Sequence, residues 1–484
     1  MRQLPGLITM VEPALWTIDE LLAASGGMLS GTVTKQLNGV SIDTRTIADG
    51  DIFVAIKGES HDAHDFVAKA LASGAGLAIV SRTTEEMMAA GPLLVVDNDP
   101  LEALEKIGRA SRSRSGARIV GVTGSVGKTS TKEMLRVALS ASGATHSSVA
   151  SFNNHWGVPL TLARMPRATA YGVFEIGMNH PGEITPLVGM VRPHVAIITN
   201  VAPVHIGNFN SVEEIADAKA EIFIGVEPGG AAILNRDNPF FERLAAAARA
   251  CGIDRIVSFG AHGKADVRSE RVVLHGNCCC VTADVLGEKL IYKLGMPGEH
   301  MAQNSLAVLA AVKLLGADLA RAAMALAVAE APKGRGVQHQ LRIDGGELLL
   351  IDESYNANPV SMAAALALLG RAKTGRNGRR IAVLGDMLEL GKHGPGLHAD
   401  LAKAVDANNV DVLYAVGPLM ANLWENTPAS RKGAVAQTSS ELLDQLLADV
   451  RAGDVVMVKG SLGSRMGPLV EAIKERFAPL NRDV

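Results

Sequence analysis

The chain has 484 residues, 48% of them hydrophobic, which is enough for several cores and, at roughly 100–200 residues per domain, predicts about three domains. A net charge of −3 without long basic runs argues against DNA or another nucleic acid as a partner. The four cysteines lack disulfide or zinc-finger spacing, which fits the reducing cytoplasm. The sequence shows neither a signal peptide nor an apolar run of about 18 residues, so we expect a protein that is neither secreted nor inserted in a membrane.

The first part of the chain predicts a small α/β domain, which we place at residues 1–113. A basic stretch, RASRSRSGAR at residues 109–118, is typical of a helix end that leads into a linker, so it marks the first boundary. The strands are expected at residues 40–43, 52–56 and 77–80, and the helices at 18–24 and 65–73.

A glycine turn containing Lys-Thr then follows a short apolar run without a gap. Residues 118–122 are typical of a buried strand and residues 129–139 of a helix. In the turn, Gly124 and Gly127 allow backbone N–H groups to close on an anion at the positive end of the helix. The strict phosphate-loop pattern requires glycine where this chain has Val122, so the match is to a variant loop.

The two residues after the turn indicate the ligand. Lys128 would reach the outer phosphates of a nucleotide, and Thr129 would offer its hydroxyl to Mg²⁺, a hard cation that prefers oxygen ligands. We therefore expect the protein to use a nucleoside triphosphate.

A second domain, residues 114–336, should contain a mostly parallel sheet with an antiparallel extension at residues 266–292. Its second boundary falls near APKGRG, residues 331–336. The predicted strands lie at residues 172–176, 194–201, 231–235 and 255–259, and the predicted helices at 211–224, 240–250, 300–315 and 319–329.

The remaining residues, 337–484, predict a Rossmann-like doubly wound domain. Three polar sequences, DESYNANP, GDMLELG and KGSLGSR, follow strand ends, where open α/β sheets bind their ligands. The strands are expected at residues 348–352, 380–384, 412–416 and 455–458, and the helices at 360–369, 397–407, 441–448 and 468–477.

Several polar residues carry two interpretations each. Glu175, inside an apolar strand, is either a magnesium ligand or a salt-bridged buried carboxylate. His205 follows a strand, and a lone histidine in such a place is more often a structural hydrogen-bonding residue than part of a functional site. Periodicity alone places Lys219 on a solvated helix face. His300 and Asn304, four residues apart, share a helix face that could hold a purine edge, or they could be a cap and a core amide.

The chain resembles the Mur ligase family, the ATP-dependent amide-forming enzymes of peptidoglycan synthesis, over essentially its whole length. The family loop T-G-x-x-G-K-T matches residues 123–129, which accounts for the displaced first glycine. Further family-like sequences are SIDTR, FVAIKG, FNNHWGVPLTL, FEIGMNHPGEI, TNVAPVHI, AKAEIF and NRDN. Within the family, DESYNANPVSM and GDMLELG resemble ligases that add D-alanyl-D-alanine to UDP-N-acetylmuramoyl-tripeptide.

The resemblance implies specific roles, with ATP and Mg²⁺ as cofactors. It implies that Lys128, Lys219, His205 and Arg335 serve catalysis. It also implies that Thr129, Glu175, His205 and Lys219 serve the metal, and in several members the lysine that matches Lys219 is carbamylated. The implied ATP-binding residues are Gly124, Ser125, Val126, Gly127, Lys128, Thr129, Ser130, His300, Asn304, Arg335 and Asp352. The implied substrate-binding residues are Ser41, Asp43, Arg45, Asn153 and Asn154 for the UDP-sugar and Tyr355, Asn356 and Asn358, with Asp352, for the incoming dipeptide.

Two other functions remain open from the sequence. One is a family ligase with a different amino acceptor, and the other is a P-loop ATPase that uses its nucleotide for conformational work. Neither a hydrophobic partner helix nor a basic face supports the second. We expect a monomer.

Overall fold

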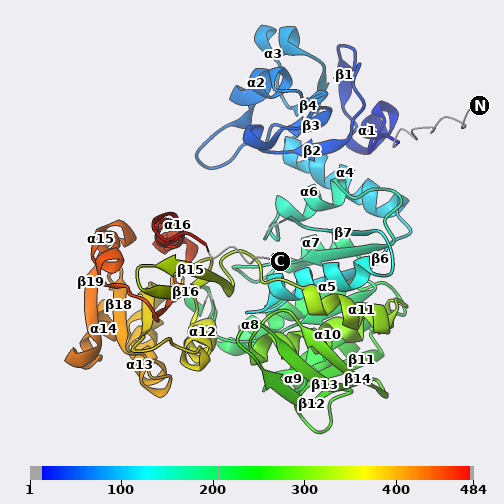
Figure 1. Cartoon of the computed structure of the whole chain (residues 1–484). Helices are drawn as coiled ribbons and strands as arrows, with labels where there is room; N and C mark the ends of the chain where they lie inside the picture. The colour runs from blue at the N-terminus through cyan, green and yellow to red at the C-terminus, as the bar shows by residue number, and fades with distance from the viewer. Residues whose placement is uncertain (1–12, 150, 205, 480–484) are drawn as a thin grey trace, which may run out of the picture. The chain divides into compact units, whose positions relative to one another are not determined.

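The computed structural model describes residues 13–149, 151–204 and 206–479, in which three β-sheets are each flanked by helices (Figure 1). This arrangement confirms the predicted α/β class. By its internal contacts the chain divides into two compact units. The first unit takes the residues up to Ala117 together with Ser151–Gly172, and the second takes Arg118–Ala150 and the residues from Val173 onward.

The first unit contains a five-stranded sheet. Its elements are α1 (Ile18–Ser25), β1 (Met28–Ser30), β2 (Gly39–Ser41), β3 (Asp51–Val54), α2 (Val67–Ala72), β4 (Leu77–Val80), α3 (Glu85–Ala90), β5 (Leu93–Val95), α4 (Pro100–Arg114) and α6 (Gly157–Ala163). The strand order is β1-β5-β4-β3-β2, with β1 antiparallel to β5 and the other neighbours parallel. Strands β3 and β4 are buried throughout, so they form the centre of the core.

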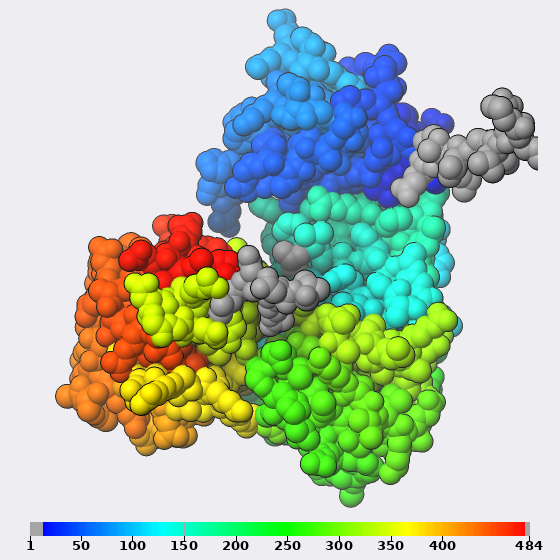
Figure 2. Space-filling model, viewed as in Figure 1, coloured from blue at the N-terminus to red at the C-terminus, as the bar shows by residue number. Residues whose placement is uncertain are grey.

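Residues 151–172 pack onto this unit although they follow the phosphate loop in sequence. Helix α6 packs against α4, which also packs against α1, and in the space-filling view the teal residues around α6 lie against the blue residues of the first unit (Figure 2). The Trp16 indole N–H donates to the Ala163 carbonyl at 2.8 Å. The guanidinium of Arg114, in the basic stretch, lies 3.6 Å from the centre of the Trp16 ring. Most of that stretch is therefore the last part of α4 rather than a free linker.

The second unit begins with a nine-stranded sheet. Its elements are β6 (Arg118–Thr123), α5 (Lys128–Ser140), β7 (Thr145–Ser147), β8 (Tyr171–Glu175), α7 (Ile184–Val191), β9 (Val195–Ile198), α8 (Val212–Ala220), β10 (Ala231–Asn235), α9 (Phe241–Ala250), β11 (Arg255–Gly260), β12 (Val267–Leu274), β13 (Cys279–Val285), β14 (Glu288–Leu294), α10 (Glu299–Leu314) and α11 (Leu319–Ala325). Strands β6, β9, β10, β11 and β12 pair in parallel, and β12, β13 and β14 form the predicted antiparallel extension. Helix α10 packs against α5, which brings it close to the phosphate loop.

The second unit also holds a six-stranded sheet of the predicted doubly wound kind. Its elements are β15 (Val337–Ile343), β16 (Gly346–Glu353), α12 (Pro359–Arg371), β17 (Arg380–Gly385), α13 (Gly394–Ala407), β18 (Val412–Val416), α14 (Ala421–Glu425), β19 (Lys432–Ala436), α15 (Ser439–Asp449), β20 (Val455–Lys459) and α16 (Gly467–Arg476). The strand order is β15-β16-β20-β17-β18-β19, and only the β15–β16 pair is antiparallel among these described strands. The central strand β20 is buried throughout.

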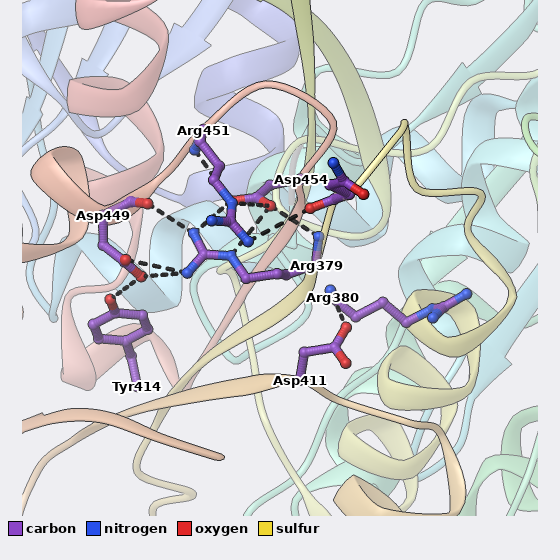
Figure 3. Close-up of polar contacts among 8 residues, drawn as sticks. Arg379, Arg380, Asp411, Tyr414, Asp449, Arg451 and Asp454 are labelled. Atoms are coloured by element: carbon purple, nitrogen blue, oxygen red, sulfur yellow. Dashed lines mark hydrogen bonds and ion pairs between the residues drawn. The ribbon is translucent and has the colours of Figure 1, made fainter. Parts of the chain in front are cut away.

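An ionic network closes the amino end of this sheet (Figure 3). The Arg379 guanidinium donates to Asp454 at 2.7 Å and to Asp449 at 3.1 Å, and the Tyr414 hydroxyl donates to Asp449 at 2.6 Å. These bonds raise the pKa of Arg379, and the Asp454 side chain is fully buried. The network joins the start of β17 to the start of β20 at the edge opposite the three polar sequences.

Candidate active site

The turn between β6 and α5 adopts a backbone that requires glycine at two positions. Gly124 has φ +149° and Gly127 has φ +87°. A Cβ on Gly124 would lie 2.0 Å from Thr199 Oγ1, and one on Gly127 would lie 2.7 Å from Asn304 Nδ2. The N-cap of α5 is Gly127, which makes no side-chain cap bond, and uncapped N–H groups at a helix start can bind an anion. This is the geometry that the sequence predicts for an anion cradle.

Residues beyond the end of β9 hold the loop in place. The Ser125 N–H donates to the Asn200 carbonyl at 2.8 Å, and the Ser125 hydroxyl donates to the Ala202 carbonyl at 2.9 Å. The Thr199 hydroxyl donates to the Val126 carbonyl at 2.6 Å. Because these hydrogen bonds come from the protein itself, the loop is held in this conformation before any ligand binds. The sequence analysis did not assign Thr199, although its position at the end of a strand next to the loop could have suggested it.

The residues after the turn form a connected polar set. Lys128 Nζ donates to the Gly124 carbonyl at 2.7 Å, so the side chain folds back over the loop. Burial lowers the pKa of Lys128, and the nearby Glu175 carboxylate opposes this effect. The Thr129 hydroxyl donates to Glu175 Oε1 at 3.2 Å. Thr129, Glu175 and Ser130 are all buried, so their oxygen atoms lie in a region largely shielded from water.

The structure corrects the periodicity-based placement of Lys219 on a solvated face. This residue, near the end of α8, is only 3% exposed. Burial lowers its pKa well below the usual range, and the nearby positive charge of Lys128 lowers it further. Lys219 is therefore a buried amine in the neighbourhood of the phosphate loop. The other predicted metal-site residue, His205, lies outside the described residues.

His300 and Asn304 both lie on α10, as their spacing predicted, but neither caps the helix, because its N-cap is Gly298. Asn304 is buried against Gly127 of the phosphate loop. His300 lines a cavity of about 1240 Å³ with Gln303. Burial lowers the pKa of His300, which favours the neutral imidazole. His300 thus lines this cavity, and Asn304 lies beside the phosphate loop.

The segment that joins the two sheets of the second unit carries Arg335. Its guanidinium lies 4.5 Å from the centre of the Tyr355 ring, and its charge contributes to the lowered pKa of Lys128. Asp352, 2% exposed, accepts hydrogen bonds from the N–H groups of Gly334 and Ser354, both at 3.1 Å. The carboxylate of Asp352 therefore shapes the backbone at this junction.

Two asparagines of DESYNANP have different surroundings. Asn358 is buried and caps α12, where its side-chain oxygen accepts from the Ser361 N–H at 2.9 Å. Asn356 is exposed, and its backbone carbonyl accepts a hydrogen bond from Lys459 Nζ at 2.9 Å. Lys459 is a buried residue that the sequence analysis did not single out.

The predicted UDP-sugar residues all lie in the first unit. The Ser41 hydroxyl donates to the Asp43 carbonyl at 3.1 Å, and the Arg45 guanidinium lowers the pKa of Asp43 through a 2.6 Å contact. Asn153 and Asn154 precede α6, and the Asn154 side-chain oxygen accepts a hydrogen bond at 2.9 Å from the N–H of Gly157, the first residue of that helix. Because α6 packs against β2, the fold brings the neighbourhoods of Ser41 and Asn154 together.

Comparisons with known proteins identify the family. Models of the Mur ligase family catalytic domain, the Mur ligase middle domain and the Mur ligase glutamate ligase domain match residues 36–112, 122–312 and 340–462. The UDP-N-acetylmuramoyl-tripeptide–D-alanyl-D-alanine ligase of Escherichia coli is 34% identical, with 95% of this chain and 98% of the relative covered. The chain belongs to the Mur ligase family.

Solved structures of Mur ligases share the three-domain fold. The crystal structure of MurF from Acinetobacter baumannii is 32% identical, has a TM-score of 0.82, and covers 95% of this chain and 99% of its own. The MurF ligase of Thermotoga maritima, solved in complex with ADP, is 25% identical with a TM-score of 0.74, covering 91% and 98% of the two chains. The resemblance inferred from the sequence motifs is thereby confirmed.

Two further observations apply to the part of this Mur ligase that the structure describes. Among residues 13–149, 151–204 and 206–479, no helix has the length and apolar character needed to cross a membrane. The same residues contain no group of three or more His, Cys, Asp or Glu side chains that could hold a metal ion by themselves.

Proposed function

We propose that this protein is the ATP-dependent ligase that joins D-alanyl-D-alanine to UDP-N-acetylmuramoyl-tripeptide in peptidoglycan precursor synthesis. The observation that carries the proposal is the preorganised glycine cradle with Lys128 and Thr129, in a chain that matches ligases of this name over nearly its full length. The alternatives of a different acceptor or an ATPase switch have no comparable support.

ATP occupies the phosphate loop in this proposal. Backbone N–H groups of the loop and of the first turn of α5, other than that of Ser125, surround the phosphates, and the ammonium of Lys128 balances the charge of the transferring phosphoryl group. His300 and Asn304 lie beside the base, in or next to the 1240 Å³ cavity. Arg335, on the segment between the two sheets, and Asp352, near the end of β16, approach the nucleotide.

The donor set near the loop suits Mg²⁺. Thr129 and Glu175 offer oxygen atoms, which this hard cation prefers, and the ion commonly keeps several waters and substrate phosphates as ligands. When bound, Mg²⁺ would neutralise charge on the phosphate oxygens. We assign His205 to the same site from the family resemblance.

Lys219 serves this site as a carbamate. Its lowered pKa favours the neutral amine, whose nitrogen can attack the carbon of CO₂ and lose a proton, giving a carboxylate on the side chain. This change places an anion beside the Lys128 cation, and the two opposite charges attract.

The substrates occupy the other parts of the chain. Ser41, Asp43, Arg45, Asn153 and Asn154 bind the UDP-sugar, and Tyr355, Asn356 and Asn358, with Asp352, contact the dipeptide. We assign residues 1–113 together with 151–172 to the UDP-sugar domain, the rest of 114–336 to the ATP domain and 337–484 to the ligase domain. The enzyme acts as a monomer in the cytoplasm and needs neither nucleic acid nor membrane.

The reaction proceeds in two steps. A terminal carboxylate oxygen of the tripeptide attacks the γ-phosphorus of ATP, and ADP leaves. The amine of D-alanyl-D-alanine then attacks the acyl carbon, loses a proton and expels phosphate. Phosphorylation is required because the negative charge of a carboxylate repels nucleophiles. The protein contributes mainly by positioning the substrates and by neutralising the charge on the transferring phosphoryl group.

Phosphate release tests the proposal. It should require ATP, UDP-N-acetylmuramoyl-tripeptide and D-alanyl-D-alanine together, and Lys128→Ala should abolish it, because the cation beside the transferring phosphoryl group is lost. Faster release with another amino acceptor, or with ATP alone, would refute the assignment. A near-normal rate in Lys128→Ala would remove the loop from the mechanism.

A further inference from the structure

The carboxyl edge of the six-stranded sheet has a buried cation at its centre. Lys459 is the last residue of the central strand β20 and is 1% exposed. Its register partner on β16 is Glu353, and Lys459 Nζ lies 3.2 Å from Glu353 Oε2. The same Nζ donates to the Asn356 carbonyl at 2.9 Å. One ammonium therefore fixes both the end of β16 and the loop that follows it.

Ser461, two residues further on, continues this connection. Its hydroxyl donates to the Ala357 carbonyl at 3.4 Å and accepts from the Leu388 N–H at 3.0 Å. The Ser461 N–H donates to the Asp386 carbonyl at 3.1 Å. The KGSLGSR segment thus joins the DESYNANP loop and the GDMLELG loop at one edge of the sheet.

Packing alone does not account for a lysine at this position. A buried charge costs free energy unless it is paired and hydrogen-bonded, and an apolar residue of similar length is often neutral or more stable in its place. The two polar contacts of the Lys459 ammonium are with Glu353 at the end of β16 and with the exposed loop at Asn356. The cation therefore determines where that loop lies.

We infer that Lys459 is a positioning residue for the amine acceptor, because it holds the loop at residues 354–358 in the place where the dipeptide binds. The inference rests on the proposed function, since it concerns the second substrate of that reaction. Phosphoryl transfer to the tripeptide uses the phosphate loop on the other sheet, so loss of this cation should leave the first step intact and impair the second.

Lys459→Met tests the inference, since it keeps the length of the side chain and removes the charge. We expect the KM for D-alanyl-D-alanine to rise about 10- to 100-fold, the range for losing a hydrogen bond to a charged group. The KM for ATP and for the UDP-linked substrate should change less than about twofold. Hydroxylamine, which captures the acyl phosphate as a hydroxamate without the dipeptide site, should react at the wild-type rate.

Two further variants complete the design. Lys403→Met removes an exposed lysine of α13 that is paired with Asp400 at 2.8 Å, and it should leave all constants unchanged. Ser461→Ala removes the second connection and should raise the KM for the dipeptide about 2- to 10-fold. If Lys459→Met is not recovered as folded protein, Ser461→Ala decides the question.

The outcomes separate this inference from the proposed function. An unchanged KM for the dipeptide in the deciding variant, or an equal loss of hydroxamate formation and ligation, overturns the positioning role. A wild-type enzyme that forms hydroxamate but does not ligate D-alanyl-D-alanine overturns the proposed function instead.

Discussion

Gly124→Ala is the most direct test of the phosphate loop because the structure locates the conflict it would cause. The new Cβ would lie 2.0 Å from Thr199 Oγ1, far inside contact distance, and the residue would retain a φ of +149°. Thr199 cannot simply turn away, because its hydroxyl donates to the Val126 carbonyl at 2.6 Å. The substitution must therefore displace the loop, Thr199 or both.

The expected cost has two parts. Overpacking of a tight site costs about 1–3 kcal/mol. A non-glycine residue held in a strained backbone conformation costs about 1–3 kcal/mol more. Because about 2 kcal/mol is then the minimum loss, and the unit that holds the loop has about 345 residues, the melting temperature should fall by at least about 3 °C. Displacement of the loop should also weaken ATP binding by about tenfold or more, which corresponds to about 1.4 kcal/mol.

Calorimetric titration with a non-hydrolysable ATP analogue and a thermal melt measure the two effects. Gly229→Ala is the matched control, because Gly229 has φ +75° and a Cβ added there would meet no atom within 4 Å. It should cost about 1–2 kcal/mol from backbone strain and leave nucleotide affinity unchanged. Adding Thr199→Ala to Gly124→Ala should restore part of the loss, with a coupling of about 0.5–3 kcal/mol.

The reasoning would be refuted if Gly124→Ala bound the analogue like the wild type and melted no lower than Gly229→Ala. It would also fail if Thr199→Ala and Gly124→Ala were simply additive, because then the predicted contact with Thr199 would not limit the loop.

The remaining predictions concern stability. Burial acts to raise the pKa of Asp62, but hydrogen bonds from His64 and Arg82 outweigh it and lower this pKa to about 2 from 3.8. A carboxylate with a lowered pKa stabilises the fold above pH 3.8, and this stabilisation is lost as the pH falls toward 2. In urea unfolding, Asp62→Asn should therefore lower the free energy of unfolding by about 2 kcal/mol at pH 7 and change it little at pH 2. Arg379→Met should cost about 3–5 kcal/mol in the same assay, because it leaves the fully buried Asp454 carboxylate without its guanidinium partner.

Each of these variants has a neighbouring control. Asp65→Asn removes an exposed partner of the same Arg82 and should change stability by less than about 1 kcal/mol. Arg380→Met removes a side chain whose guanidinium donates to the Ala372 carbonyl at 3.3 Å, and it should cost about 1 kcal/mol. A loss in either control equal to that of its partner variant would contradict the assigned contacts.

The sequence alone predicted the strand, glycine turn and helix at residues 118–139 and the α/β class correctly, because both depend on local patterns. Gly124 and Gly127 are required by the backbone of a short turn, and the apolar run before them and the helix after them are visible in adjacent residues. The central strands, such as Leu77–Val80 and Val412–Val416, were also predicted because they are buried on both faces and so form continuous apolar runs.

The sequence analysis missed strands at the sheet edges. Strands β1, β7, β15 and β19 are all edge strands, and none is buried along its whole length. Their exposed or half-exposed residues weaken the apolar pattern on which strand prediction depends.

What the sequence by itself determined is the chemistry of short segments: the glycine cradle, the polar strand ends and the family motifs. The tertiary structure alone decided that Lys219 is buried near Lys128, that residues 151–172 join the first unit, and that Lys459 holds the loop at Asn356. The reason is that burial and contact depend on which elements pack together. Periodicity in one helix or strand describes its own faces, whereas the residues that cover a face can come from hundreds of positions away.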